Sequence, residues 1–91
     1  MTPHKELYLT FHDYAEGDYV PCVMCGKEGV DIHHISARGI GGSRCKDYPE
    51  NLAALCRICH TSAEMSSDFN ALVRIKTLEK CVFSLKLIAG K

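Results

Sequence analysis

The sequence predicts a small α+β domain that a bound metal ion holds together. Three observations support this prediction: the chain has only 91 residues, it carries two Cys-x-x-Cys pairs, and a short strand pattern lies between segments with helical spacing. A chain of this length has a thin hydrophobic core for the conformational entropy that folding costs, so a structural metal ion stabilises it substantially. We expect a single domain over residues 1–91.

The composition excludes several classes of protein. The 11 Lys and Arg residues balance the 11 Asp and Glu residues, so the chain does not bind nucleic acid or an anionic membrane through bulk positive charge. A hydrophobic share of 46% excludes intrinsic disorder. No apolar run approaches the ~18 residues that span a bilayer, and the N-terminus lacks the apolar core of a signal peptide. We therefore expect a cytoplasmic protein without a membrane segment.

The first half of the chain predicts one helix and one strand. Apolar side chains recur at helical spacing in residues 3–15, with polar residues between them, which predicts a short amphipathic helix. Residues 18–21 are expected to be extended, and residues 30–35 to form a strand. Glycines and charged residues dominate residues 36–48, which predicts a loop.

The second half predicts two helices. Residues 51–55 fit either an extended segment or the lead into a helix, and residues 57–65 fit a helix. Two serines and an aspartate at 66–68 can start a further helix, which we expect over about 67–88. Apolar residues alternate in residues 81–88, so that a strand remains an alternative there.

The two cysteine pairs predict a structural zinc site. Two residues separate the cysteines of each pair, which lets both sulfurs of a pair reach one ion, and two pairs complete a tetrahedron. The four expected zinc ligands are Cys22, Cys25, Cys56 and Cys59. A redox dithiol is the alternative, but it leaves the second pair unexplained. Of the two remaining cysteines, Cys81 is expected in the core and Cys45 in the loop.

Two consecutive histidines, His33 and His34, lie in the predicted strand between the cysteine pairs. Successive strand residues point to opposite faces, so one imidazole can bind a metal ion while the other faces a substrate or water. His60 and Glu64 follow the second pair at the i, i+4 spacing that helical metal sites use. The alternative interpretation is that these are solvated surface residues.

The order of these residues resembles the HNH endonucleases, in particular the small zinc-bearing branch of phages, prophages and restriction systems. The resemblance covers residues 22–64 and implies a ββα-metal core of treble-clef type, with flanking helices. The residues that carry it are Cys22-x-x-Cys25, Asp31-Ile32-His33-His34-Ile35, Arg38-Gly39, Gly41-Gly42, Asn51-Leu52 and Leu55-Cys56-Arg57-x-Cys59-His60.

The resemblance implies a role for each residue of the motif. His33 takes the place of the first ligand of a catalytic divalent ion, and His60 that of the second. His34 takes the place of the general base. Asn51 orients the base or its loop, or binds the ion. Glu64 stands where bacteriocin-type DNases carry a third histidine ligand, and it binds the ion directly, through water or not at all.

The activity that the resemblance implies is metal-dependent hydrolysis of DNA that leaves 5′-phosphate and 3′-hydroxyl ends. The ligands suit Mg²⁺, Mn²⁺, Ni²⁺ or Zn²⁺ to different degrees and do not select among them. Phage DNA packaging, restriction and mobile elements all use this module, so packaging or other nucleic-acid-processing proteins are expected partners.

Four cations between His33 and His60, against two carboxylates, give this part of the chain a positive balance. Such side chains contact phosphates and carry little sequence information, so we expect little sequence specificity. The expected phosphate contacts are Arg38, Arg44, Lys46 and Arg57.

The alternative function is a non-catalytic zinc module that holds a nucleic acid or a protein. Such a module has no need of His34, Asn51 and His60 together. The flanking helices can pack on the core or form a dimer surface. We expect core packing, in a monomer or a homodimer.

Overall fold

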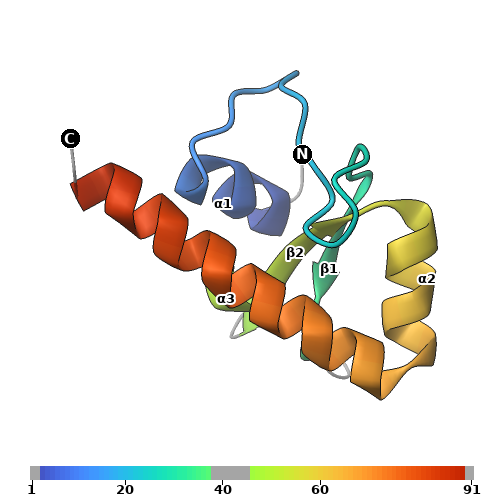
Figure 1. Ribbon diagram of the computed structural model, residues 1–91. Coiled ribbons are helices and arrows are strands. Elements are labelled where there is room, and N and C mark those ends of the chain that lie inside the picture. The colour runs from blue at the N-terminus through green and yellow to red at the C-terminus, as the bar shows by residue number, and fades with distance from the viewer. Residues whose placement is uncertain (1–2, 38–45, 90–91) are drawn as a thin grey trace.

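The computed structural model describes residues 3–37 and 46–89 and confirms an α+β fold with a two-stranded sheet and helices around it. The elements in chain order are α1 (Pro3–Phe11), β1 (Asp31–His34), the 3-10 turn η2 (Pro49–Asn51), β2 (Leu52–Leu55), α2 (Arg57–Met65) and α3 (Ser67–Ala89). In Figure 1, α3 crosses in front of the two strands, α2 lies at the end of β2, and α1 lies on the far side.

The sheet is one antiparallel pair in which His33 lies opposite Ala53 and His34 lies opposite Leu52. Directly paired residues share a face of a sheet, and successive residues alternate between faces. His33 therefore shares its face with Ala53, and His34 shares the other face with Leu52. All four residues of β2 are buried, so both faces of the sheet are covered.

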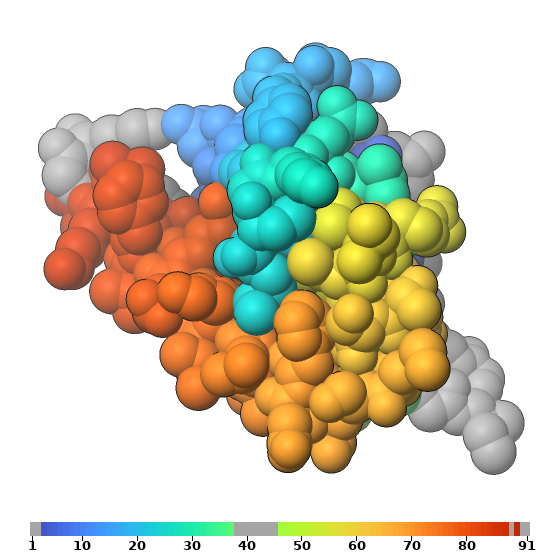
Figure 2. Space-filling view, turned by 45° about the vertical axis from the view of Figure 1, so that its right-hand side comes forward, coloured from blue at the N-terminus to red at the C-terminus, as the bar shows by residue number. Residues whose placement is uncertain are grey.

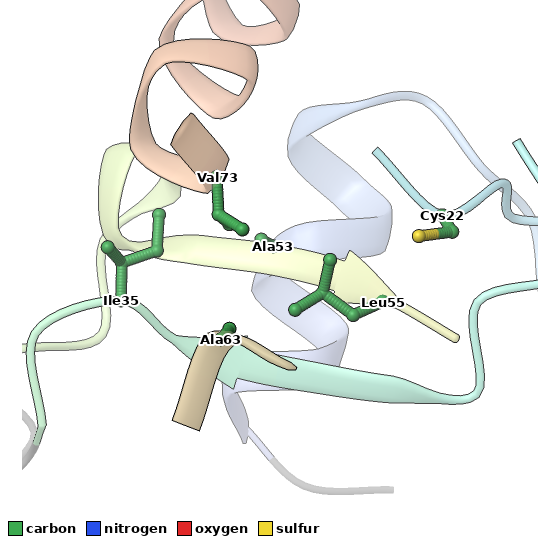
Figure 3. Close-up of a cluster of buried hydrophobic side chains, with 6 residues drawn as sticks. All are labelled: Cys22, Ile35, Ala53, Leu55, Ala63 and Val73. Atoms are coloured by element: carbon green, nitrogen blue, oxygen red, sulfur yellow. The ribbon is translucent and has the colours of Figure 1, made fainter. Parts of the chain in front are cut away.

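One face packs against α2 and α3. Ala53 and Leu55 of β2 meet Ala63 of α2 and Val73 of α3 in one buried cluster, which Figure 3 shows together with Ile35 and Cys22. Val23 and Met24 pack against the same cluster. In Figure 2 the cyan segment near residues 20–30 lies between the yellow start of α2 and the orange part of α3. This face thus joins the first cysteine segment to both C-terminal helices.

The other face packs against α1. Tyr8 and Leu9 of α1 are buried against Leu52 and Ala54 of β2. The small side chains of Ala53 and Ala54 lie on opposite faces of β2, so α1 can approach one face closely while α2 and α3 approach the other. Gly29 serves the same purpose, since a Cβ on it would lie 3.1 Å from the Cβ of Ala54.

The structure confirms the two predicted C-terminal helices but ends the first helix earlier than the sequence pattern predicts. α1 ends at Phe11 rather than at residue 15, because Asp13 adopts a left-handed φ of 61° and Tyr14 N–H turns back to the carbonyl of Leu9. Residues 81–88 continue α3, as expected for a helix over about 67–88, and the alternative of a strand there is wrong. Residues 51–55 begin in η2 and then form β2.

α3 packs on the core through small side chains, namely Val73, Thr77, Cys81 and Ser84. The expectation of core packing holds for this face only. Phe69 packs against the core, but seven other large apolar side chains of α3 are 43% to 62% exposed, namely Leu72, Ile75, Leu78, Val82, Phe83, Leu85 and Leu87. No helix in the described part of the chain is long and apolar enough to cross a membrane.

His12 links α1 to α3 as a buried neutral side chain. It is 7% exposed, and its Nδ1 forms a hydrogen bond of 2.6 Å with Ser84 Oγ. Burial, and then the charge of nearby Lys80, lowers the pKa of His12 from 6.5 to about 4. The unfolded chain therefore binds more protons than the folded chain between these values.

This shift predicts acid-sensitive stability. The contribution of His12 to the free energy of unfolding is complete above pH 6.5 and decreases as the pH falls toward 4. Between pH 7.5 and 5 the wild type should lose about 2 kcal/mol relative to His12→Asn, which keeps a polar atom for Ser84 but does not titrate. Urea unfolding of both zinc-loaded proteins measures this difference, and parallel pH profiles would contradict it.

Candidate active site

The four cysteines meet at the edge of the sheet. Cys22 and Cys25 lie on a turn in which Cys22 N–H donates to the carbonyl of Lys27 and Gly26 adopts a φ of +79°. A side chain is strained at that φ, so glycine suits the position. Tyr19 Oη donates to the carbonyl of Gly26 and fixes the turn from outside.

The second pair begins α2. Cys56 is the N-cap of this helix. Cys59 N–H donates a hydrogen bond to Cys56 Sγ, with 3.5 Å between nitrogen and sulfur. Helix N-termini favour negative charge, which suits a thiolate. Burial alone would raise the pKa of Cys22, but backbone N–H groups of Cys56, Cys25 and Met24 outweigh it and lower the pKa to about 7.

The cluster fits zinc. One ligand atom from each cysteine lies within 4.8 Å of the others, and Cys25 Sγ and Cys56 Sγ are 3.6 Å apart. A tetrahedral zinc ion with bonds of about 2.3 Å holds its sulfurs about 3.8 Å apart. The ion would tie the turn of residues 22–25 to the start of α2.

His33 faces α2 and α3, where it is 8% exposed. Asn70 Nδ2 donates to the carbonyl of Ile35, so Asn70 presents its Oδ1 to His33 Nε2 at 2.8 Å. Nε2 of His33 therefore carries the proton, and Nδ1 carries the lone pair that a metal ion can use. Burial lowers the pKa of His33 despite the hydrogen bond to Asn70, which favours the neutral imidazole that binds metals.

His60 lies beside His33, with the ring centroids 5.0 Å apart. Asp31 Oδ2 accepts a hydrogen bond of 2.9 Å from His60 Nδ1, which leaves Nε2 as the ligand atom. This carboxylate–histidine pair is typical of metal sites, where it fixes the ring orientation and raises the basicity of the ligand. Glu64 Oε1 lies 3.7 Å from His60 Nε2, so its carboxylate lies next to this ligand atom.

His34 faces α1 and the segment before η2. Its Nε2 lies 2.6 Å from Asp47 Oδ1, and its ring packs edge-on against His4 at 4.8 Å between centroids. The carboxylate accepts the Nε2 proton, so that Nδ1 carries the lone pair of the neutral ring. His33, His34, His60 and Glu64 all line one open hollow on the surface.

A family model described as HNH endonuclease matches residues 22–65. These residues belong to the HNH endonuclease family. The matched segment contains both cysteine pairs, the sheet and α2, whereas α1 and α3 lie outside it. Searches of curated proteins and of solved structures give no match.

Asn51 of the HNH domain is fully buried and holds the loop that joins the strands. Its Oδ1 accepts from Ser36 N–H at 2.7 Å, and its Nδ2 donates to the carbonyls of Ser36 and Lys46 at 3.0 and 2.9 Å. These three bonds tie the residues after β1 to those before η2. The arrangement favours the orienting role of Asn51 over binding of the ion.

The predicted phosphate contacts lie in different places. Arg57 at the start of α2 has a side chain that is 76% exposed and lies 3.5 Å from the carboxylate of Asp31. Lys46 is half-buried, and its carbonyl accepts a hydrogen bond from Asn51 Nδ2. Arg38 and Arg44 lie outside the described residues.

The residues that orient the three histidines do not follow from the sequence pattern. Asp31 belongs to the quoted motif, but its bond to His60 spans 29 positions. Asp47 and Asn70 reach their histidines over 13 and 37 positions. Asn70 could have been noticed in the sequence as a candidate partner, since it is a polar residue between the apolar Phe69 and Val73 on the inner side of a predicted helix.

The cysteine cluster predicts a zinc-dependent fold. The wild type should keep one zinc ion per chain after dialysis against citrate, whereas Cys59→Ser should lose it. The free energy of unfolding of Cys59→Ser should fall by several kcal/mol, because the metal binding energy is also folding energy. Cys81→Ala removes a buried thiol outside the cluster and should keep one zinc ion per chain. Elemental analysis and thermal unfolding measure both effects. Full zinc content in Cys59→Ser would contradict the four-cysteine site.

Proposed function

We propose that the protein is a metal-dependent DNA endonuclease in which His33 and His60 hold a divalent ion and His34 is the general base. The observation that carries this proposal is the placement of three oriented histidines around one hollow. His33 and His60 lie together on one side, and His34 lies beside a carboxylate on the other.

The ligand side of the hollow offers candidate ligands for a divalent ion. Both imidazoles have one nitrogen engaged by Asn70 or Asp31, so each offers the other nitrogen as a ligand. Glu64 is 64% exposed and adds a carboxylate next to His60. When bound, Mg²⁺, Mn²⁺, Ni²⁺ or Zn²⁺ stabilises negative charge on the phosphate and on the leaving oxygen.

The base side of the hollow suits removal of a proton from water. Asp47 accepts the Nε2 proton of His34, and Nδ1 can then take a proton from the attacking water. Asp47 also stabilises the imidazolium that forms. Attack on phosphorus with departure of the 3′ oxygen, which takes up a proton from solvent water, leaves 5′-phosphate and 3′-hydroxyl ends. Asn51 positions the loop that supplies Asp47.

DNA is the substrate that the domain and its cations favour. Arg57 is exposed at the start of α2, and Arg74 donates to Ser36 Oγ at 2.7 Å next to the residues that line the hollow. Together with Lys46, Arg38 and Arg44 these side chains can contact phosphates. Such contacts carry little sequence information and make affinity strongly dependent on salt.

The non-catalytic zinc module remains the alternative function. It requires the cysteine cluster, and it does not require three histidines that line one hollow and form hydrogen bonds with Asp31, Asp47 and Asn70. Phage packaging and other nucleic-acid-processing proteins remain the partners that we propose for the nuclease.

Cleavage of supercoiled plasmid tests the proposed base. His34→Ala should cut 10²- to 10⁴-fold more slowly than the wild type with added Mg²⁺ or Mn²⁺, which is about the usual contribution of a general base. EDTA should abolish cleavage by the wild type. His12→Asn removes a histidine remote from the hollow and should cut at a rate close to that of the wild type. Full activity in a folded His34→Ala protein would contradict the assignment.

The exposed side of α3 supports a homodimer. Ala71, Ile75, Leu78, Val82, Leu85 and Ala89 follow one another at spacings of four and three residues along the helix. This heptad pattern, with Ile and Val alternating with Leu, is typical of a seam between like helices. Glu79 and Lys86 flank the seam at the same heptad position, so an antiparallel second copy can bring opposite charges together.

Light scattering after gel filtration tests this pairing. The wild type should have the mass of a dimer, whereas Val82→Glu should be a monomer because it places like charges in the seam. Lys76→Glu changes charge on another side of α3 and should remain a dimer. A monomeric wild type would contradict the pairing and leave this face to another partner.

A further inference from the structure

A second group of metal-binding side chains lies on the far side of the sheet from His33 and His60. It consists of His4 of α1, His34 at the end of β1 and Asp47 before η2. One ligand atom from each of these residues lies within 4.8 Å of the others. His4 lies outside the segment that matches the HNH family, so the family match does not account for this group.

The three ligands suit a transition-metal ion of the zinc type. Imidazole binds Zn²⁺, Cu²⁺ and Ni²⁺ well, whereas Mg²⁺ prefers sites made only of oxygen atoms. A tetrahedral zinc ion with bonds of about 2.0–2.1 Å needs its ligand atoms about 3.3 Å apart. His34 Nε2 and Asp47 Oδ1 are now 2.6 Å apart, so a small rotation of the carboxylate makes room for the ion.

All three side chains are partly accessible. His4 is half-buried, and the side chains of His34 and Asp47 are 14% and 10% exposed. An ion can therefore reach the group without unfolding of the domain. The three segments that supply the ligands are already held in place, by the packing of α1 on β2 and by the hydrogen bonds of Asn51.

We propose that His4, His34 and Asp47 form an inhibitory site for Zn²⁺ or a similar transition-metal ion. The inference rests on the proposed role of His34 as the base. An ion on Nε2 of His34 replaces the proton that Asp47 now accepts, and the neutral ring then carries its proton on Nδ1. Nδ1 loses the lone pair that takes the proton from water, so an occupied site stops cleavage.

Zinc counting tests the site independently of nuclease activity. His60→Ala removes a ligand of the proposed catalytic ion and serves as the background. Equilibrium dialysis against buffered free zinc should show one zinc ion beyond the one held by the four cysteines. The additional change His4→Ala should remove this extra ion, whereas Lys5→Ala, the neighbouring exposed residue of α1, should keep it.

The extra zinc ion must depend on His4 for the proposal to stand. It is overturned if the His60→Ala background binds only the cysteine-held ion, or if the extra ion persists after His4→Ala. Since these measurements use zinc binding alone, they are informative even when the wild type cuts no DNA. In that case the proposed nuclease function fails while the metal site is still measured.

The inhibitory effect has its own readout. The quantity to measure is the rate of Mg²⁺-supported plasmid cleavage with zinc divided by the rate without zinc. This ratio should be at least about tenfold lower for the wild type than for His4→Ala, because zinc bound at the site removes the base. Lys5→Ala should match the wild type. An equal ratio in wild type and His4→Ala would overturn inhibition through this site, since zinc would then act at the catalytic ligands.

Discussion

The antiparallel pairing of β1 with β2 is the interaction on which the site depends. It places His33 opposite Ala53 and His34 opposite Leu52, so the two imidazoles leave the strand on opposite faces. His33 reaches His60 and Asn70 on the C-terminal helices, whereas His34 reaches Asp47 and His4. A shift of the register by one residue would exchange the two sets of partners.

Two four-residue strands do not form a stable sheet by themselves, so both ends of the pair need support. At one end the cysteine cluster joins the turn after Pro21 to the N-terminus of α2, directly after β2. At the other end Asn51 ties the chain after β1 to the chain before η2 through three hydrogen bonds. The metal-binding cysteines after β2 and the buried amide of Asn51 before it thus hold this strand at both ends.

The sequence predicts those parts of the molecule that follow from local spacing. The zinc cysteines follow from the Cys-x-x-Cys spacing, and the bounds of α2 follow from helical spacing. The opposite directions of His33 and His34 follow from the two-residue period of a strand. The orienting partners Asp47 and Asn70 do not, because they come from a loop and from a helix distant in sequence. The inner side of α3 after Phe69 does not follow from the sequence pattern either, since it uses small and polar residues while most large apolar residues of this helix face outward.

The central claim is that His33 and His34 perform different tasks from neighbouring positions. Calorimetric titration of Mn²⁺ into protein loaded with one zinc ion per chain measures this division directly. The wild-type, His33→Ala and His34→Ala sequences are compared in a His4→Ala background, which removes a ligand of the second site. The account predicts that His33→Ala binds Mn²⁺ at least about tenfold more weakly and that His34→Ala binds it like the wild type. Unchanged affinity in His33→Ala, or a loss of affinity only in His34→Ala, would contradict it.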